Sequence, residues 1–521
     1  MVESTGNLVS IDFESRESKP LEESIFFQGS FFWIENEAGV WVKKTEPQLR
    51  RWLKGQGVTH GLTAAQKEAG ESLSELDKLL LKVETDNVVE WCGVLAGRKA
   101  GLYTMSGQRV LVTHSPKLIE PVEPGEKEAT LDLSQFAHAR PHDDIMGGCR
   151  GWPVLGHFWR NLFTCKRTAD EFGGAVPMDF TPEDFDQRMN FFAWLQRGVR
   201  AVYESDRLKG HAILLAGEPE CGKTCTVWIL QQLFGGRIAR PLRWVSGASN
   251  FNSNMFTAPL LVIDDEANKT TIKDRKVLSA QVKQITAVMA GTMEGKRKDE
   301  IELEPIWRLV FATNLEESNL LVFPPLDDDI RDKVILFKAY SAPFPWHRQS
   351  TEAEVQDLIG PELPYFLHWL LYEFEVPDSY KARWGVEPWH HPEIREKIEF
   401  LSPEARQWSF IERTVLRSAN YYNDKPLEYG VWQGPIGDLD EALRDPENGL
   451  SFKEKEKLPV ANTMGKYLKS LSEMPSYKGM ITQKRTGKSR YWVLMTRDKA
   501  DELAAKETAQ DEMEMEEEIE L

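Results

Sequence analysis

Residues 211–234 read HAILLAGEPECGKTCTVWILQQLF, and this stretch decides the fold of the central part of the chain. Residues 217–224 fit the pattern G-x-x-x-x-G-K-[ST], which a chain of 521 residues matches by accident only ~0.02 times. The apolar run at 212–216 predicts a buried strand before the glycine-containing loop, and residues 226–234 predict a helix after it. A phosphate-binding loop requires this order of strand, loop and helix. We therefore expect a nucleoside triphosphate site here.

The residue types of this loop suit phosphate binding. Backbone N–H groups of the loop and of the helix N-terminus surround the phosphates, so Glu220 and Cys221 are tolerable although small residues are more usual there. Lys223 is expected to reach the β- and γ-phosphates, and the Thr224 hydroxyl is expected to ligate Mg²⁺. The expected ATP-binding residues are Gly217, Glu218, Pro219, Glu220, Cys221, Gly222, Lys223, Thr224 and Cys225.

An acidic element, which a triphosphatase also requires, follows about forty residues later. In APLLVIDDEA, the apolar residues Leu260 to Ile263 predict a buried strand, and three carboxylates come directly after it. Such a strand end can place one carboxylate on Mg²⁺ and another against the attacking water. We assign Asp264 to the metal, and the catalytic base is either Asp265 or Glu266.

Two polar residues further along the chain fit the same reaction. The strand predicted in WRLVFATN ends on Asn314, whose side chain can hydrogen-bond the γ-phosphate or the attacking water. Arg331 follows in PPLDDDIRDKVILF, where an arginine that reaches a neighbouring subunit's γ-phosphate would supply charge to the transition state. An intramolecular salt bridge to Asp327–Asp329 is the alternative role for Arg331.

The order of apolar strands and helical segments predicts an α/β core within a multidomain protein. Strands that alternate with helices form parallel sheets with crossover connections. We expect an N-terminal α+β accessory domain at 1–145, a helical linker or collar at 146–205, a P-loop ATPase core at 206–340, a helical lid or connector at 341–404, a winged-helix-like domain at 405–496 and an acidic disordered tail at 497–521.

Composition places the chain among soluble globular proteins. Hydrophobic residues make up 41% and charged residues 28%, and no run approaches the ~18 apolar residues that cross a bilayer. The first residues carry no secretory-signal pattern, and the five cysteines form no CxxC pair. We therefore expect a cytoplasmic protein without membrane contact, disulfides or zinc.

The net charge of −18 argues against a protein that coats nucleic acid with its whole surface. Much of the imbalance comes from the final DEMEMEEEIEL, which has seven carboxylates and no base. A terminal run of like charge is usually disordered and solvated. The alternatives are a tail that competes with nucleic acid for a basic groove and a tail that docks a replication partner.

Residues 436–495 have the outline of a winged helix. A short helix precedes a second helix with apolar residues at helical spacing, among them Met464, Leu468 and Leu471, and a hairpin follows. Basic residues on such a wing suit contact with the backbone of duplex or origin DNA, although these domains also serve as protein-interaction modules. The basic residues of the wing are Lys484, Arg485, Lys488 and Arg490.

The motif order GEPECGKT, LLVIDDE, LVFATN and DDDIRDKVILF resembles that of the superfamily 3 helicases, which are AAA+ ATPases of viruses, phages and plasmid-like elements. More narrowly, it resembles the ATPase module of phage and poxvirus-type primase-helicases and of the virulence-associated protein E group, over residues 190–400. No primase catalytic motif is found upstream. The resemblance implies P-loop roles for Lys223 and Thr224, Mg²⁺ and base roles for Asp264 and an adjacent acid, a sensor role for Asn314 and an arginine-finger role for Arg331.

The resemblance also implies a β-hairpin before the sensor strand, which would project basic residues into the pore of a hexamer. The matching stretch is MEGKRKDEIELEPIW, with Lys296, Arg297 and Lys298 at its tip. A basic tip in an acidic chain fits contact with single-strand phosphates, because such contact needs only local positive charge. A solvated turn is the alternative.

Together these features predict an ATP-dependent DNA helicase or replication initiator of a phage or other mobile element. It would be a homo-hexameric ring that uses ATP and Mg²⁺ to translocate on single-stranded DNA. A second hypothesis is an AAA+ ATPase that remodels or senses nucleic acid without unwinding it, for example in phage defence. A third is a winged-helix regulator that binds duplex DNA and is not an enzyme.

Overall fold

The computed structural model divides the chain into two compact units, Met1–Ile394 and Arg395–Leu521. Among the residues that it describes, no helix has both the length and the apolar character needed to cross a membrane. The described residues are 21–125, 150–164, 182–206, 208–264, 272–287, 290–294, 300–341, 344, 346–347, 349–417, 421–422, 425–426, 428–447, 449–456, 458–474, 477–486 and 489–506.

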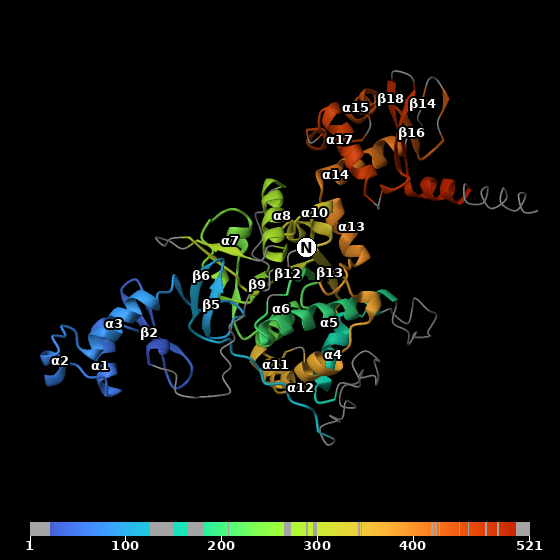
Figure 1. The fold of residues 1–521 in the computed structure, drawn as a ribbon. Coiled ribbons are helices and arrows are strands. Elements are labelled where there is room, and N and C mark those ends of the chain that lie inside the picture. The colour runs from blue at the N-terminus through green and yellow to red at the C-terminus, as the bar shows by residue number, and fades with distance from the viewer. Residues whose placement is uncertain are drawn as a thin grey trace, which may run out of the picture. The chain divides into compact units, whose positions relative to one another are not determined.

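A parallel sheet of five strands forms the centre of the first unit, which confirms the predicted α/β core (Figure 1). The strand order is β13-β7-β12-β9-β8, so the strand before the phosphate loop has a neighbour on each side. Strands β7 and β9 are buried along their whole length, as continuous apolar runs predict for a covered parallel sheet. The strands are β7 (Ala212–Gly217), β8 (Ile238–Ala239), β9 (Leu260–Ile263), β12 (Arg308–Asn314) and β13 (Val334–Ala339).

Helices cover both faces of this sheet, and α6 and α8 lie on opposite sides of it in Figure 1. On one face, Ile213 and Leu215 of β7 pack into a large apolar cluster with Phe192 of α5 and Leu230 of α6. Alternate residues of a strand point to the same face, which explains their spacing. The helices and turns of this part are α4 (Pro153–Leu162), α5 (Pro182–Tyr203), α6 (Lys223–Leu233), α7 (Leu242–Val245), η5 (Met255–Thr257), α8 (Ile272–Ala287), α9 (Glu317–Leu320), α10 (Asp328–Arg331), α11 (Glu352–Ile359), η6 (Gly360–Glu362), α12 (Leu363–His368), the π-helical turn η7 (Trp369–Glu373), η8 (Asp378–Tyr380) and α13 (Pro392–Phe400).

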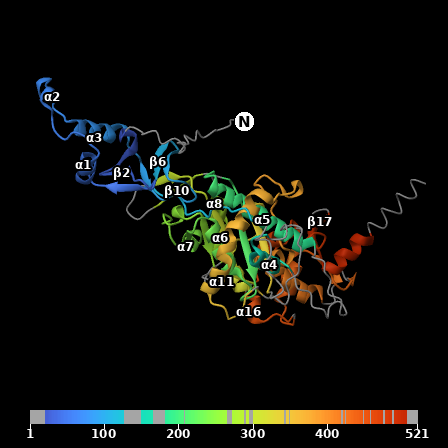
Figure 2. The ribbon, with the colours of Figure 1, turned by 90° about the horizontal axis from the view of Figure 1, so that it is seen from below.

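Two small sheets precede this core. In the first, β1, β2 and β3 are antiparallel, and α1 and α3 pack beside them (Figure 2) through apolar residues such as Ile34, Leu49 and Leu80. In the second, β6 pairs in parallel with β4 and antiparallel with β5. The elements are η1 (Leu21–Ser24), β1 (Ile25–Gln28), β2 (Phe31–Glu35), β3 (Trp41–Lys44), α1 (Glu46–Gly55), α2 (Ala64–Glu68), α3 (Glu75–Asp86), β4 (Trp91–Gly93), β5 (Gly101–Met105) and β6 (Gln108–Val112).

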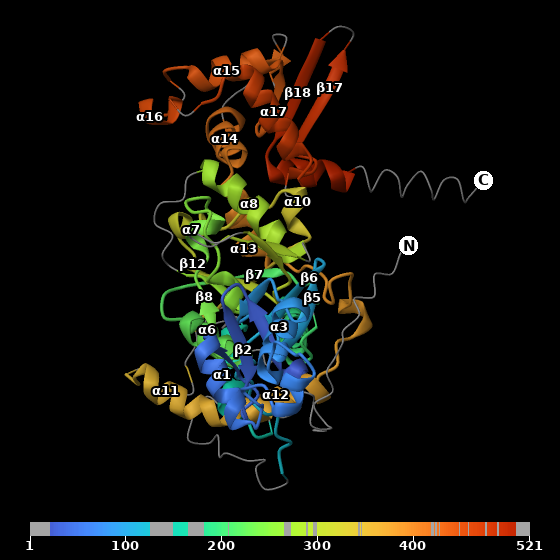
Figure 3. The ribbon, with the colours of Figure 1, turned by 60° about the vertical axis from the view of Figure 1, so that its left-hand side comes forward.

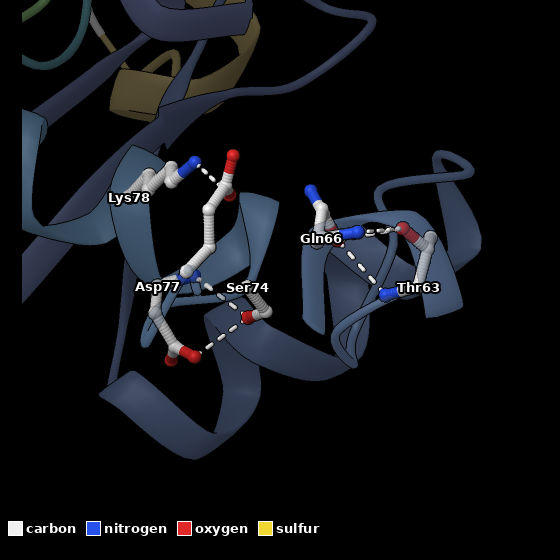
Figure 4. Close-up of polar contacts among 6 residues, drawn as sticks. Thr63, Gln66, Ser74, Asp77 and Lys78 are labelled. Carbon is white, nitrogen blue, oxygen red and sulfur yellow. Dashed lines mark hydrogen bonds and ion pairs between the residues drawn. The ribbon is translucent and has the colours of Figure 1, made fainter. Parts of the chain in front are cut away.

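Side-chain caps fix where two of these helices begin (Figure 4). The Thr63 hydroxyl accepts a hydrogen bond from the backbone N–H of Gln66, whose side chain accepts one in return from the N–H of Thr63. The Ser74 hydroxyl accepts from the N–H of Asp77 at 3.2 Å. These bonds satisfy N–H groups that have no partner within the helix, so α2 and α3 begin at defined residues.

The second unit combines helices with a three-stranded antiparallel sheet in the order β16-β18-β17. Figure 3 shows α17 beside the paired strands β17 and β18. Met464, Leu468 and Leu471 of α17 are buried, as their helical spacing predicts. The elements are α14 (Pro403–Ile411), the π-helical turn η9 (Glu412–Leu416), β14 (Tyr421–Tyr422), β15 (Lys425–Pro426), β16 (Val431–Gly434), α15 (Ile436–Arg444), α16 (Phe452–Lys455), α17 (Ala461–Ser472), β17 (Ile481–Thr486) and β18 (Ser489–Met495).

Candidate active site

Gly217 ends β7 between two neighbouring strands, opposite Asn314 of β12 and Ala339 of β13. A Cβ atom at this position would lie 2.4 Å from the carbonyl oxygen of Ala339 and 2.6 Å from Sγ of Cys221. Glycine is therefore required where the chain leaves the sheet. The loop ends at Gly222, whose φ of 91° lies in the left-handed region that favours glycine. Two glycines thus shape the loop, and α6 begins directly after it.

The amine of Lys223 lies inside this loop. Its Nζ donates hydrogen bonds to the carbonyl oxygens of Gly217 at 3.0 Å and of Glu218 at 2.7 Å. Only 8% of Lys223 is exposed, and a buried ammonium group needs such acceptors. A phosphate oxygen is a stronger acceptor for an ammonium group than a carbonyl is. The loop carbonyls therefore hold the amine where phosphate oxygens can replace them.

The two unusual loop residues have different environments. The Glu220 side chain is exposed, and its φ of 61° is in the left-handed region. Cys221 is buried, and its Sγ lies 3.5 Å from Nζ of Lys223. Burial raises the pKa of the Cys221 thiol above its ordinary value, which keeps it neutral. Cys221 therefore packs under the loop as a small apolar residue, a role that the sequence pattern did not reveal.

The loop opens onto a cavity of about 410 Å³, within the usual range for ligand sites. Residues 219–225 line one side of it, and Asn314 lines it from the end of β12. The parallel pairing of β7 with β12 explains this meeting, since parallel strands end at the same edge of the sheet. The further lining residues, which no motif in the sequence indicates, are Trp228, Phe344, Trp346, Glu352, Val355 and Gln356.

Asp264, the expected metal ligand, follows β9 directly and is not among the residues that line this cavity. Nη1 of Arg240 contacts both carboxylate oxygens of Asp264. Arg240 follows β8, which pairs in parallel with β9, so the two side chains leave the sheet at the same edge. Both side chains are partly exposed, and an exposed ion pair of this kind contributes only ~0–1 kcal/mol to stability. Asp265 and Glu266, the two candidates for the base, lie outside the described residues.

The donor set fits Mg²⁺ by its chemistry. Mg²⁺ prefers oxygen ligands and is held by one or two carboxylates together with substrate phosphates and water. The exposed Thr224 hydroxyl at the start of α6 and the Asp264 carboxylate are oxygen donors of this kind. Within the described part of the chain, there is no group of three or more His, Cys, Asp or Glu residues that could hold a metal ion. In such a site, phosphate oxygens would supply part of the coordination.

Arg331 is the last residue of the short helix α10 and does not line the cavity of its own chain. Its Nη2 donates to the carbonyl oxygen of Leu326 at 3.5 Å. The carboxylate of Asp327 caps α10 by accepting from the N–H of Ile330 at 3.1 Å. The Asp329 carboxylate lies 2.5 Å from Nζ of Lys283 in α8. Asp327 and Asp329 thus have contacts with other groups, and the salt bridge to Asp327–Asp329 stays an alternative role for Arg331.

The candidate nucleic-acid contacts are described only in part. Strands β10 (Gly291–Met293) and β11 (Ile301–Leu303) pair antiparallel and flank the expected basic hairpin tip. The tip residues Lys296, Arg297 and Lys298 lie outside the described residues, as does Lys488 of the wing. On the wing, Lys484, Arg485 and Arg490 are exposed, and Arg485 lies directly opposite Arg490 across β17 and β18.

A parallel sheet, a glycine-shaped loop after one of its interior strands, a buried lysine and a cavity at the carboxyl edge define a P-loop α/β core. Residues 215–331 match a family described as "Family of unknown function (DUF5906)". None of the curated proteins matches the chain.

Three solved structures are similar to the chain at low sequence identity. One is the apo structure of the NrS-1 C-terminal region, with 11% identity, a TM-score of 0.43 and coverage of 91% of this chain and 97% of the other. The second, "SCCmec type IV Cch - active helicase", has 11% identity, a TM-score of 0.34 and coverage of 90% and 91%. The third, an X-ray structure of JCV helicase, has 14% identity, a TM-score of 0.22 and coverage of 43% and 61%. Helicases are thus among the structural neighbours, and this is the class that the motif order resembles.

Proposed function

We propose that this chain is an ATP-dependent DNA helicase or replication initiator of a phage or mobile element, working as a homo-hexameric ring. The observation that carries the proposal is the meeting of Lys223 and Asn314 on one cavity at the carboxyl edge of the sheet. Such a cavity combines a phosphate-binding loop with a polar group that can orient the γ-phosphate or the attacking water. These are the functions that ATP hydrolysis requires from a protein.

In this proposal, ATP phosphates take the place of the loop carbonyls of Gly217 and Glu218 at the Lys223 amine. Thr224 and Asp264 hold Mg²⁺, which when bound neutralises phosphate charge. Asp264 would exchange its contact with Arg240 for the metal. An exposed ion pair costs little to break, so this exchange is compatible with rapid turnover.

Arg331 would act on the γ-phosphate of a neighbouring subunit. Its absence from the lining of the cavity of its own chain is compatible with such a role. The Asp327 cap and the Lys283–Asp329 contact support the helix that carries it. Hydrolysis would then require assembly, because an arginine at the transition state contributes ~10³- to 10⁵-fold to the rate.

Contacts with DNA would come from two places. The hairpin between β10 and β11 would bring Lys296, Arg297 and Lys298 to single-stranded DNA in the ring. The winged-helix-like domain would contact duplex DNA through its wing. Arg485 and Arg490 face each other across the wing strands, and like charges in this position repel unless an anion lies between them. A DNA phosphate would satisfy both guanidinium groups.

Steady-state ATPase assays test the nucleotide site. We expect K223A to lose phosphate binding and R331A to lose turnover while still binding ATP. A matched control is R237A, which removes an exposed arginine that does not line the cavity. Near-normal turnover in both K223A and R331A would remove the proposed mechanism.

Unwinding of a forked DNA substrate tests what hydrolysis drives. The wild type should unwind the fork, and the triple alanine variant of Lys296, Arg297 and Lys298 should hydrolyse ATP without unwinding. ATPase activity that DNA does not stimulate, together with no unwinding, would favour the remodelling or sensing ATPase. Tight duplex binding that is indifferent to nucleotide and to K223A would favour the winged-helix regulator.

A further inference from the structure

Two stacked aromatic rings form an aromatic wall at the phosphate loop. Phe344 and Trp346 follow β13, and their rings are parallel within 2° with centroids 4.9 Å apart. The fully buried Phe158 of α4 stacks against both, at 6.0 Å and 5.6 Å, and so supports them from behind. A Cβ atom at Gly222 would lie 2.9 Å from Phe158 and 3.0 Å from Phe344. The wall therefore lies directly against the loop.

The wall is also open to the cavity. Phe344 and Trp346 are only partly buried, and both line the cavity together with Trp228 of α6. Flat aromatic surfaces of this kind bind planar rings by stacking, and the stacking does not depend on which base is bound. Since the phosphate loop is part of the same cavity, a planar ring here could belong to the same ligand as the phosphates.

Two polar side chains of α11 line the cavity beside the wall. Nε2 of Gln356 donates a hydrogen bond to Oε1 of Glu352 at 2.9 Å. An ionised carboxylate can only accept hydrogen bonds, and the remaining Gln356 oxygen is an acceptor as well. The Glu352–Gln356 pair therefore favours a ligand edge that donates N–H groups. An exocyclic amino group on a ring is such an edge.

We propose that this side of the cavity binds the base of the nucleotide and selects an aminopurine. The ring adds to the stack of Phe344 and Trp346, and its amino group donates to the Glu352–Gln356 pair. A two-ring base overlaps more of an aromatic face than a single ring does. The inference rests on the proposed function, because the loop at Lys223 must hold the phosphates of the same ligand.

Calorimetric binding of five probes tests this proposal on the full chain: inorganic tripolyphosphate, ATP, GTP, CTP and purine riboside triphosphate, which has no amino group. We expect an aminopurine nucleotide to bind more tightly than all other probes, and comparison of ATP with GTP identifies the base. W346A should lower the affinity for that nucleotide by about 5- to 100-fold and leave the affinity for tripolyphosphate unchanged. W346F should restore most of the affinity, since it restores an aromatic face.

Substitutions in α11 test the role of the Glu352–Gln356 pair. E352A should lower the affinity for the aminopurine nucleotide about tenfold, to the affinity that purine riboside triphosphate has for the wild type. Purine riboside triphosphate should bind E352A and the wild type with equal affinity. D357A is the matched control, because it removes an exposed acid from the same helix outside the cavity. It should bind every probe as the wild type does.

Three outcomes would overturn the base site while leaving the phosphate loop intact. ATP and GTP could bind no more tightly than tripolyphosphate or CTP. W346A could lower the affinity for tripolyphosphate as much as the affinity for ATP, which would mean that the wall only supports the loop. Both W346A and E352A could bind every nucleotide as the wild type does. A K223A variant that keeps full tripolyphosphate affinity would instead contradict the proposed phosphate site.

Discussion

Gly217 and Asn314 lie directly opposite each other on the parallel strands β7 and β12. Because the two strands end together, the loop after Gly217 and the side chain of Asn314 reach the same cavity. Backbone hydrogen bonds of the sheet hold this arrangement, so the polar side chain is placed relative to the loop by a rigid element. Such placement is what a group that orients a reacting phosphate requires.

Replacing Asn314 with alanine should therefore lower kcat for ATP hydrolysis by about 10²- to 10³-fold, the usual loss for one positioned polar group at a transition state. KM for ATP should change much less, since the loop still holds the phosphates. N319A is the control, because Asn319 lies in α9 outside the cavity, where its side-chain amide donates a hydrogen bond to the Glu316 carboxylate. An unchanged kcat in N314A would contradict the sensor role.

Gly217→Ala should destabilise the protein by about 1–3 kcal/mol, because the added methyl group would collide with backbone. Its Cβ would lie 2.4 Å from the Ala339 carbonyl oxygen. This oxygen belongs to the backbone of β13, which cannot move away as the end of a flexible side chain can. Urea unfolding measures the loss. Gly55→Ala provides the control, since a Cβ there meets nothing within 4 Å. Equal stability of the two variants would show that the strand ends can separate.

The sequence predicted the sheet and the loop because both depend on local patterns. Continuous apolar runs identified β7, β9 and β12, and the glycine spacing identified the loop that holds Lys223. The Arg240–Asp264 contact could not be predicted, because it depends on two neighbouring strands ending together and leaves no mark in the spacing of the residues. The aromatic wall of the cavity could not be predicted either, because it also depends on contacts between distant parts of the chain.

Phe344 and Trp346 each follow a proline in the sequence, and no periodic pattern there shows which way a ring faces. Their importance comes from packing on Phe158, which is far away in the chain. Sγ of Cys221 likewise lies where only a glycine at position 217 leaves room for it, since a Cβ there would be 2.6 Å away. Tertiary packing, and not local propensity, decided these parts of the site.

Glu220→Gly should keep full ATPase turnover, in contrast to K223A. The Glu220 side chain is exposed, and its left-handed backbone is strained for any residue with a Cβ atom by roughly 1–2 kcal/mol. Glycine removes this strain but adds freedom to the unfolded chain, so we expect a net stabilisation below about 1 kcal/mol. ATPase assays and urea unfolding measure the two effects. A loss of turnover comparable to that of K223A would mean that the Glu220 carboxylate takes part in the reaction.

Glu362 provides a pH-dependent element at the N-terminus of α4. Its carboxylate accepts hydrogen bonds from the N–H groups of Val154 at 3.1 Å and of Leu155 at 2.7 Å. Burial raises the pKa of Glu362 from its ordinary value of 4.5 to about 7, and the two N–H groups oppose this shift. Desolvation of the charged form therefore exceeds the benefit of the two hydrogen bonds.

Because the pKa of Glu362 is higher in the folded state, the folded state binds this proton more tightly than the unfolded state does. The resulting contribution to stability is complete below about pH 4.5 and is lost as the pH rises through about 7. The loss is on the order of 3 kcal/mol for a shift of this size. E362Q cannot titrate, so its stability relative to the wild type should increase between about pH 5 and about pH 8 in urea unfolding. D357N, which alters an exposed acid, should keep the wild-type pH dependence of stability. If E362Q also kept that pH dependence, Glu362 would ionise at its ordinary pKa in the folded protein.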